Sequence, residues 1–126
     1  MGKTDTSNKN NRWTVEKEGN NIRLKNVGTG KYMDVAVNDI SKDTKNNTNV
    51  WQYDKQTKAS LSKTQQFSYE KVTQGKNVYY RIKPSYASSF CIDAAGDNLK
   101  NGSNIQVYKV TGGSNNKTQL FVFKKV

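Results

Sequence analysis

Apolar residues recur at every second position in several short runs of this chain, and polar segments separate the runs. Period-two alternation puts the apolar side chains on one face of a β-strand. The runs that contain this alternation are Trp13–Val15, Ile22–Leu24, Val50–Tyr53, Val78–Ile82, Ile105–Tyr108 and Leu120–Phe123. No segment of the sequence carries the 3.6-residue apolar spacing of an amphipathic helix. The pattern therefore predicts an all-β fold.

The segments between the runs are rich in glycine, asparagine, serine and lysine. Residues 26–30 (Asn-Val-Gly-Thr-Gly) and 111–116 (Thr-Gly-Gly-Ser-Asn-Asn) are two examples. Glycine and asparagine tolerate positive φ angles, and short polar side chains bond to the nearby backbone. These segments are predicted to form the turns between strands.

The chain also contains an internal repeat, because four segments recur in the same order. The matching pairs are Ile22–Lys25 with Tyr80–Lys83, Tyr32–Val35 with Cys91–Ala94, Asn49–Tyr53 with Asn104–Tyr108, and Thr64–Phe67 with Thr118–Phe121. In addition, Asn11–Lys17 aligns with Gln65–Lys71, which contains the last strand of the first unit. The sequence thus predicts nine strands: one leftover strand, followed by two complete units of four.

Composition supports a folded domain with a strongly basic surface. The chain has 126 residues, enough for one domain with a modest core, and its aromatic residues fall within the regular runs. Lysine and arginine number 21 against 10 acidic residues, a net charge of +11. Such a charge favours anionic partners, among them nucleic acid, anionic glycans and cell-wall polymers, but scattered lysines can also simply solvate a surface.

Several kinds of chemistry are excluded by residues that the sequence lacks. There is no histidine and one cysteine, Cys91, so Cys-His and Ser-His-Asp catalysis and the usual zinc sites have no ligands or bases. We expect no cofactor and no metal. Cys91 alternates with Ile92 and is predicted to be a small buried hydrophobic residue rather than a reactive thiol. No apolar stretch approaches the length of about 18 residues that a membrane span requires.

The repeat resembles the ricin B-type lectin family, whose units carry a hydrophobic-Asp strand, a strand ending in an aromatic residue, and a Gln-x-Trp or Gln-x-Phe strand. The second unit matches more closely, through Cys91–Asp93, Asn101–Tyr108 and Gln119–Phe121. The resemblance covers residues 11–126, and residues 1–10 are expected to be a disordered or linker segment. It implies a β-trefoil, in which three such units form a closed barrel and a hairpin cap. It assigns a structural role within the repeat to Trp13, Gln65, Phe67, Gln119 and Phe121, with the aromatic residues in the core.

The resemblance also implies a set of sugar-binding residues. The aspartate at the end of the second strand of each unit accepts hydrogen bonds from sugar hydroxyls. The aromatic residue that ends the third strand stacks on the apolar face of a pyranose, and the residue two positions before it adds a polar contact. The candidate carbohydrate-binding residues are Asp34, Trp51 and Tyr53 in the first unit, and Asp93, Gln106, Tyr108 and Asn116 in the second.

Two departures from the family pattern affect these sites. Trp51 stands where the second unit has the polar Gln106. The family usually has an asparagine before the Gln of Gln-x-Trp, whereas this chain has Thr64 and Thr118, and Asn116 is a candidate substitute.

Each candidate also has a purely structural interpretation. Asp34 and Asp93 are then turn-initiating residues after a strand. Tyr53 and Tyr108 are half-buried strand aromatics. Trp51 either stacks on a ligand or covers the core.

The hypothesis with most support is a non-enzymatic carbohydrate-binding module that recognises galactose-type or related glycans. Such a module would direct a larger secreted or cell-surface protein, such as a toxin complex, to those glycans. One alternative is a basic module that binds polyanions without sugar specificity, and another is a structural trefoil for protein interaction. Nucleic acid is disfavoured as the partner, because the basic residues are interspersed with Asp and Glu. A glycosidase with paired carboxylates is disfavoured, because Asp34 and Asp93 occupy equivalent places in different units and would not face each other across one bond.

A complete trefoil has twelve strands, and this sequence predicts nine. An open sheet would expose unpaired strand edges, which folded proteins avoid. The sequence leaves three explanations open: the chain is part of a longer trefoil, another chain fills the gap by swapping or dimerisation, or residues 1–10 and the long loop after Asp34 contribute more than expected.

Overall fold

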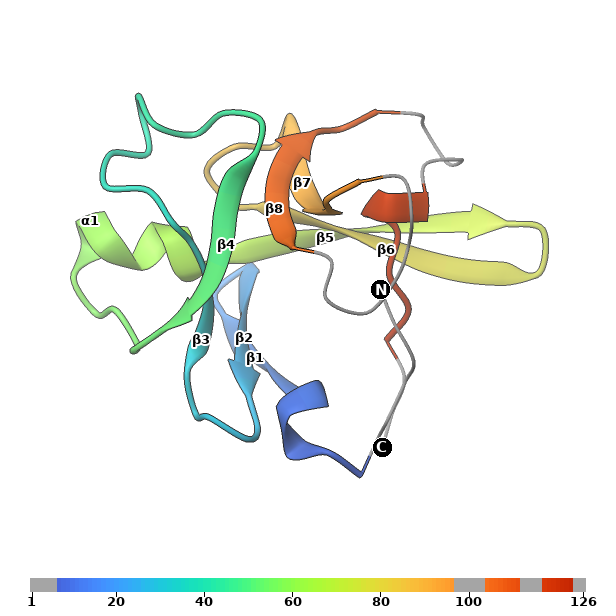
Figure 1. Cartoon of the computed structure of the whole chain (residues 1–126), viewed down its shortest axis with the longest axis horizontal. Coiled ribbons are helices and arrows are strands. Elements are labelled where there is room, and N and C mark those ends of the chain that lie inside the picture. Colours follow the sequence, from blue (N-terminus) through green and yellow to red (C-terminus); the bar gives the residue numbers. More distant parts are fainter. Residues whose placement is uncertain (1–6, 97–103, 112–116, 124–126) are drawn as a thin grey trace.

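The computed structural model describes residues 7–96, 104–111 and 117–123. Within these ranges the chain forms eight strands (Figure 1): β1 (Trp13–Glu18), β2 (Asn21–Asn26), β3 (Tyr32–Val35), β4 (Thr48–Tyr53), β5 (Phe67–Gln74), β6 (Asn77–Pro84), β7 (Phe90–Ala94) and β8 (Ile105–Lys109). The helical segments are short: α1 (Ala59–Ser62) and the 3-10 helices η1 (Lys9–Asn11), η2 (Lys63–Gln65) and η3 (Lys117–Gln119). The predicted all-β class is confirmed. The helical turns were not predicted, because three or four residues are too few to show a periodic apolar stripe.

All the strand pairs are antiparallel, and the strand order is β6-β5-β2-β3-β4-β8-β7, with β1 paired to β2. Two hairpins, β1–β2 and β5–β6, begin their turns in the same way. Gly19 and Gly75 follow the last residues of β1 and β5 with φ angles of 61° and 59°, which L-residues with a side chain rarely adopt. In Figure 1 the long β5–β6 hairpin extends to the right, away from the β3–β4 hairpin.

The predicted repeat is visible in the pairing of the barrel strands. Ile22 at the start of β2 pairs with Phe67 at the start of β5. In the second unit Tyr80 of β6 pairs with Phe121, through Phe121 N–H to Tyr80 O at 2.8 Å and Tyr80 N–H to Phe121 O at 2.7 Å. The ninth predicted strand is therefore present as this isolated bridge, which follows η3.

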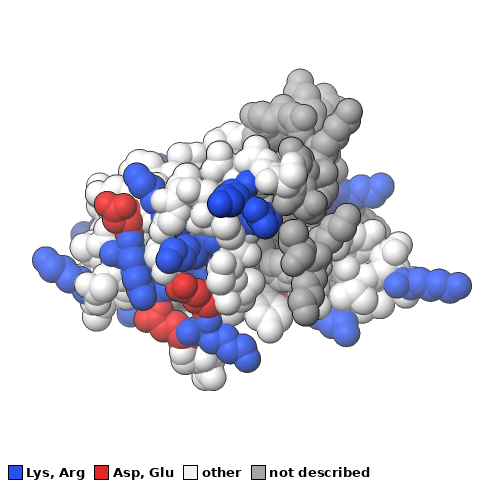
Figure 2. Space-filling model, turned by 90° about the horizontal axis from the view of Figure 1, so that it is seen from below, with Lys and Arg blue, Asp and Glu red and all other residues white. Residues whose placement is uncertain are grey.

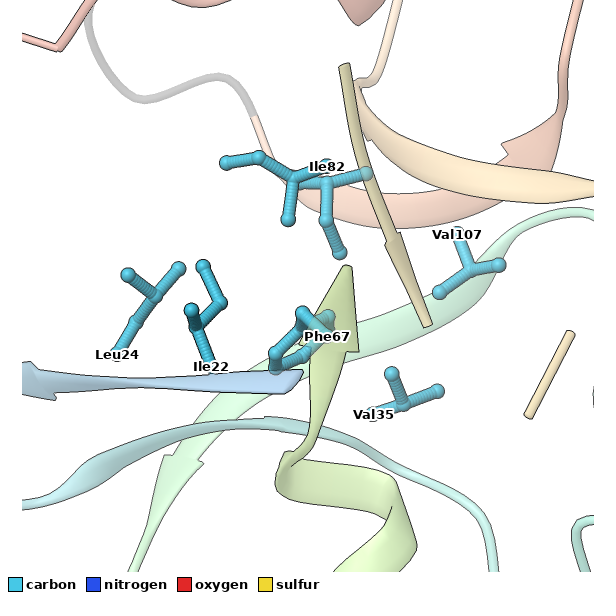
Figure 3. Close-up of a cluster of buried hydrophobic side chains, with 7 residues drawn as sticks. Ile22, Leu24, Val35, Phe67, Ile82 and Val107 are labelled. Atoms are coloured by element: carbon cyan, nitrogen blue, oxygen red, sulfur yellow. The ribbon is translucent and has the colours of Figure 1, made fainter. Parts of the chain in front are cut away.

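The core contains side chains from both units and from both the barrel and the hairpins. Its fully buried members are Ile22, Leu24, Val35, Phe67, Ile82, Ile92 and Val107. Figure 3 shows Phe67, a residue of the Gln-x-Phe motif, among Ile22, Val35 and Ile82. Burying an aliphatic or aromatic side chain of this size contributes about 1.5–3 kcal/mol relative to leaving it exposed, so the cluster is the main stabilising feature.

Cys91 is completely buried in β7, as predicted for a small hydrophobic residue. Burial raises the pKa of its thiol to about 12. The thiolate, which is the reactive form, is therefore scarcely populated at neutral pH.

None of the helices in the described ranges is long and apolar enough to cross a membrane.

Candidate functional site

Two equivalent hairpins, β3–β4 and β7–β8, carry the candidate sugar-binding residues. Asp34 of β3 lies directly opposite Trp51 of β4, and Asp93 of β7 lies directly opposite Gln106 of β8. Because side chains two positions apart on a strand share a face, the aromatic residue that ends each third strand joins the same side of its hairpin. The structure thus groups the predicted residues of each unit, with Asn116 the exception, since it lies outside the described residues.

The aspartate of the first unit is held by the Gln-x-Phe glutamine. Gln65 Nε2 donates to Asp34 Oδ2 at 2.9 Å and to the Asp54 carbonyl oxygen at 2.8 Å. Gln65 Oε1 accepts from the Gln56 backbone N–H at 2.9 Å and from Arg23 Nη1 at 2.8 Å. The buried side-chain amide of Gln65 therefore forms hydrogen bonds through both its nitrogen and its oxygen. These bonds connect the carboxylate of Asp34 to the segment that follows β4.

The second unit repeats this arrangement. Gln119 Nε2 donates to Asp93 Oδ2 at 2.8 Å and to the Lys109 carbonyl oxygen at 2.9 Å. Gln119 Oε1 accepts from the Thr111 backbone N–H at 3.1 Å. Gln65 and Gln119 are both fully buried, as is Phe67, whereas Trp13 and Phe121 are partly buried and pack against the core cluster.

Both aspartates are largely buried, each with 6% of its surface exposed. Burial raises the pKa of Asp34, and hydrogen bonds from Gln65, Thr64 and Trp51 oppose this effect. Burial likewise raises the pKa of Asp93.

For Asp93 the opposing hydrogen bonds come from Gln119, Thr118 and Gln106. The threonines that replace the family's asparagine therefore help to lower the pKa of the aspartates, and the Thr64 hydroxyl donates to the Leu61 carbonyl oxygen at 3.0 Å. Trp51 and Gln106 also lower the pKa of the aspartates in their respective units, although one is an indole and the other an amide.

The two sites differ in what they present to solvent. In the first unit Trp51 and Tyr53 are 49% and 46% exposed, and their rings stack with centroids 5.8 Å apart at an interplanar angle of 24°. In the second unit Gln106 is only 7% exposed and Tyr108 is half-buried. The first unit, which matches the family less closely in sequence, thus has the more open aromatic surface.

The long loop before β4 explains why the second site is covered. Asn47 Nδ2 donates to Gln106 Oε1 at 3.0 Å, and Asn47 N–H donates to the Val107 carbonyl oxygen at 2.9 Å. Asn46 Oδ1 accepts from the Lys109 N–H at 2.8 Å. Sequence reasoning missed Asn46 and Asn47, because their partners lie about 60 residues further along the chain and no local pattern marks them.

Basic side chains surround the neighbouring Tyr32, which pairs with Tyr53 across the hairpin. Arg23, Lys25 and Lys55 lie 5.8–6.0 Å from the centre of the Tyr32 ring. The Tyr32 hydroxyl donates to Glu16 at 2.7 Å. Figure 2 shows a similar mixture on the face that it displays, with carboxylates between lysines and arginines rather than a surface of one sign.

Residues 9–108 match the sequence model of the family described as ricin-type beta-trefoil lectin domain-like. The chain belongs to this family. The predicted resemblance is therefore confirmed, and the ricin B-like domain is one of a family of carbohydrate-binding proteins. The comparison with curated protein sequences gave no match.

Solved structures confirm the fold of the ricin B-like domain. It is similar to ThreeFoil, a designed protein with three-fold symmetry, with a TM-score of 0.68 and 21% identity over 93% of this chain and 74% of that one. It is also similar to the ricin B-like lectin of Macrolepiota procera in complex with lactose (TM-score 0.65, 17% identity, 92% of this chain and 71% of that one). A third similar structure is the Rhizoctonia solani agglutinin (TM-score 0.65, 20% identity, 95% and 72%). The predicted β-trefoil is confirmed.

Asp34 and Asp93 of the ricin B-like domain belong to two separate hydrogen-bond networks. Asp34 is held by Gln65 of η2 and Asp93 by Gln119 of η3, so each belongs to the network of its own unit. In the part of the chain that the structure describes, no group of three or more His, Cys, Asp or Glu residues could hold a metal ion.

Proposed function

We propose that the domain is a non-enzymatic carbohydrate-binding module whose principal site is the aromatic surface of the first unit. The observation that carries this proposal is the stacked, exposed pair Trp51 and Tyr53 beside the fixed carboxylate of Asp34. Flat rings offer a large contact area to the apolar C–H face of a pyranose at low entropic cost. The carboxylate is acceptor-only when ionised, which suits sugar hydroxyls.

The ligand that we propose is a galactose-type or related glycan. Support comes from the Macrolepiota procera lectin, which has the same fold and was solved with lactose. The equivalent group of the second unit, Asp93, Gln106 and Tyr108, would act as a weaker site, since Asn47 already occupies the Gln106 amide oxygen. Asn116 stays a candidate ligand of that site.

The test is a glycan array followed by titration calorimetry with the best ligand, using the Trp51→Ala and Tyr53→Ala variants. We expect each to weaken binding about tenfold, equivalent to about 1.4 kcal/mol, because the stacking surface is lost. Leu61→Ala is the matched control, since Leu61 is also an exposed apolar residue (40% exposed) but contributes no side chain to either site. Equal binding by all three variants, or no sugar binding by the unmodified chain, would overturn the proposal.

A basic module for polyanions is the second candidate, and the net charge of +11 favours it. On the face that Figure 2 displays, the interspersed carboxylates argue against a continuous cationic track. The salt dependence of the affinity distinguishes the two functions. Between 50 and 500 mM NaCl, counterion release should lower the affinity for a polyanion by about tenfold for each neutralised phosphate or sulfate. The affinity for a neutral sugar should change little over the same range.

We further propose that the module is secreted or displayed at the cell surface, where it directs a larger protein or a toxin complex to glycans. The proposal follows from the ligand, because glycans of this class are presented on cell surfaces. Detection of the protein only inside cells by fractionation would contradict it. A trefoil that binds no sugar and acts only in protein contacts is the remaining outcome of the glycan array.

A further inference from the structure

The first unit carries two lysines beside its exposed aromatic pair. Lys25 of β2 lies directly opposite Tyr32 of β3, which in turn lies directly opposite Tyr53 of β4. Residues that lie opposite one another in neighbouring strands share a face of the sheet, with their Cβ atoms about 5 Å apart. The ammonium groups of Lys25 and Lys55 lie 6.0 and 5.8 Å from the centre of the Tyr32 ring. Two positive charges are therefore adjacent to the aromatic surface of the proposed site.

The lysine of the second unit that is equivalent to Lys25 is neutralised within the protein. The internal repeat makes Lys83 equivalent to Lys25, and Glu70 equivalent to Glu16. Lys83 Nζ lies 2.7 Å from Glu70 Oε2, and Arg81 Nη1 lies 2.8 Å from Glu70 Oε1. The charge of Lys83 thus already has a partner.

In the first unit the equivalent carboxylate is engaged by a tyrosine instead. The Tyr32 hydroxyl donates to Glu16 Oε1 at 2.7 Å. The residue equivalent to Tyr32 in the second unit is Cys91, which has no hydroxyl to offer. Among the residues that the structure describes, Lys25 forms no ion pair. The exchange of one side chain therefore accompanies the release of this lysine from the pairing seen in the second unit.

Lys55 is specific to the first unit as well, because the residue at the equivalent place in the second unit is the apolar Val110. The carboxylate nearest in charge to Lys55 is Glu18, which Arg23 bonds through Nε and Nη2. Hydrogen bonding to Arg23 is the largest cause of the lowered pKa of Glu18, and the charge of Lys55 lowers it further. Lys55 itself is exposed and, like Lys25, has no ion-pair partner within the described ranges.

We propose that Lys25 and Lys55 form a cationic subsite that binds one acidic group of the glycan, a carboxylate or a sulfate, while the sugar ring stacks on Trp51 and Tyr53. This inference rests on the carbohydrate-binding function proposed above and names the class of its ligand. Hydrogen bonds between an ammonium group and an anionic oxygen are roughly twice as strong as those between neutral groups. The subsite therefore favours an acidic sugar over its neutral counterpart.

The carboxylates around the subsite limit the ligand to a single acidic group. Glu16 and Glu18 lie on β1, Asp34 lies on β3, and the exposed Asp54 directly follows β4. A polyanion that extended beyond the two lysines would meet these like charges, which repel it. One acidic substituent on a stacked sugar gains the attraction of the lysines without this cost.

The experiment uses the full chain and a set of lactose probes that differ in one substituent. Lactose is the neutral probe, and the acidic probes carry a sulfate or a sialic acid on O3 or O6 of the galactose. The methyl esters of the sialylated probes are neutral controls of the same size. In titration calorimetry at 50 mM NaCl we expect an acidic probe to bind about fivefold more tightly than lactose, and this preference should shrink at 500 mM NaCl because exposed charges are screened.

Charge-removing variants locate the acidic group. Lys25→Gln and Lys55→Gln should each reduce the preference for the acidic probe over lactose about threefold, as expected for an exposed ion pair, and the double variant should abolish it. Lys76→Gln is the matched control: it removes the same charge in the turn of the β5–β6 hairpin, which extends away from the β3–β4 hairpin (Figure 1), and should leave the preference unchanged. If Lys25→Gln lowers the Tm, the exposed Lys55 alone provides the test.

The inference is overturned if no acidic probe binds more tightly than lactose, or if Lys76→Gln reduces the preference as much as Lys55→Gln, because the net charge then explains it. In either case, lactose binding that Trp51→Ala weakens leaves the carbohydrate proposal standing. If no probe binds, or if Trp51→Ala binds the acidic probes as well as the unmodified chain does, both proposals fail. Stronger binding of the sulfated than of the sialylated probes, or the reverse, identifies the acidic group as a sulfate or a carboxylate.

Discussion

Two buried glutamines connect the motif of the repeat to its candidate sites. Gln65 and Gln119 each hold an aspartate carboxylate and backbone groups of the following segment through the two ends of one amide. The motif thereby positions Asp34 and Asp93 without itself reaching solvent. A buried glutamine can thus position a candidate site residue without lining the site.

Replacing Gln65 with alanine should lower the free energy of unfolding by about 2–3 kcal/mol, because the Asp34 carboxylate, the Asp54 carbonyl and the Gln56 N–H each lose a partner. Urea unfolding followed by fluorescence measures the change. Gln52→Ala is the control: this exposed glutamine accepts one bond, from the Thr29 hydroxyl, and its loss should cost less than about 0.5 kcal/mol. Similar costs for both variants would contradict the assigned role.

The raised pKa of Asp34 predicts the direction in which this carboxyl changes the free energy of unfolding as pH rises. Between the ordinary aspartate pKa of about 3.9 and the raised value, the folded chain binds more protons than the unfolded one, so this carboxyl lowers stability as pH rises. The Asp34→Asn variant lacks this effect. Its unfolding free energy, relative to the unmodified chain, should therefore increase as pH rises from 3 through that window.

Asp39 is the control, because its carboxyl should change the free energy of unfolding in the opposite direction as pH rises. The side-chain and backbone hydrogen bonds of Ser41 lower the pKa of Asp39, so this carboxyl adds stability as pH rises through its lowered value. The Asp39→Asn variant should accordingly lose stability relative to the unmodified chain over that range. Parallel curves for the two variants would show that burial does not control Asp34.

At the scale of elements, alternation and the internal repeat were sufficient to predict the strands and which segments of the two units are equivalent. The structure gives the aligned segments equivalent hairpin registers, with Asp34 opposite Trp51 and Asp93 opposite Gln106. The exposure of each site did not follow. It depends on the docking of the loop before β4 onto β8 through Asn46 and Asn47, a contact between distant segments that local spacing does not encode.

This docking can be tested at Asn47, which has a positive φ angle of 71° although it is not a glycine. Asn47→Gly and Asn47→Ala both remove the bond to Gln106, but alanine also bears the steric cost of the left-handed conformation, about 1–2 kcal/mol. Asn47→Ala should therefore be less stable than Asn47→Gly by about 1 kcal/mol in urea unfolding. Equal stabilities would mean that the loop relaxes out of this conformation.

At the scale of the whole molecule, the burial of apolar side chains favours the folded state, whereas the repulsion between basic side chains opposes it. The core is built from two units, the chain carries a net charge of +11, and several large apolar side chains, among them Val15, Tyr69 and Phe123, are exposed. A net charge of this size makes copies of the chain repel one another. The same repulsion opposes the compact state.

Screening that repulsion should stabilise the fold. We expect the Tm to rise by a few degrees between 20 and 200 mM NaCl at pH 7, because the Debye length falls from above 20 Å to below 10 Å and the repulsion between lysines weakens. Differential scanning calorimetry measures the shift, and an equal concentration of an uncharged osmolyte controls for non-ionic effects. A Tm that falls with salt would mean that the ion pairs, such as Lys83 with Glu70 at 2.7 Å, outweigh the repulsion.

The way the hairpins cross the unit boundaries has a consequence for folding. In β1–β2 and β5–β6 the strand that ends one unit pairs along its length with the strand that begins the next. Stacked-repeat proteins, in contrast, have units that contact their neighbours through whole faces and can fray one at a time. Here no unit can unfold without opening a hairpin shared with its neighbour, so the repeat in the sequence does not imply independent folding. The domain should melt as a single cooperative body.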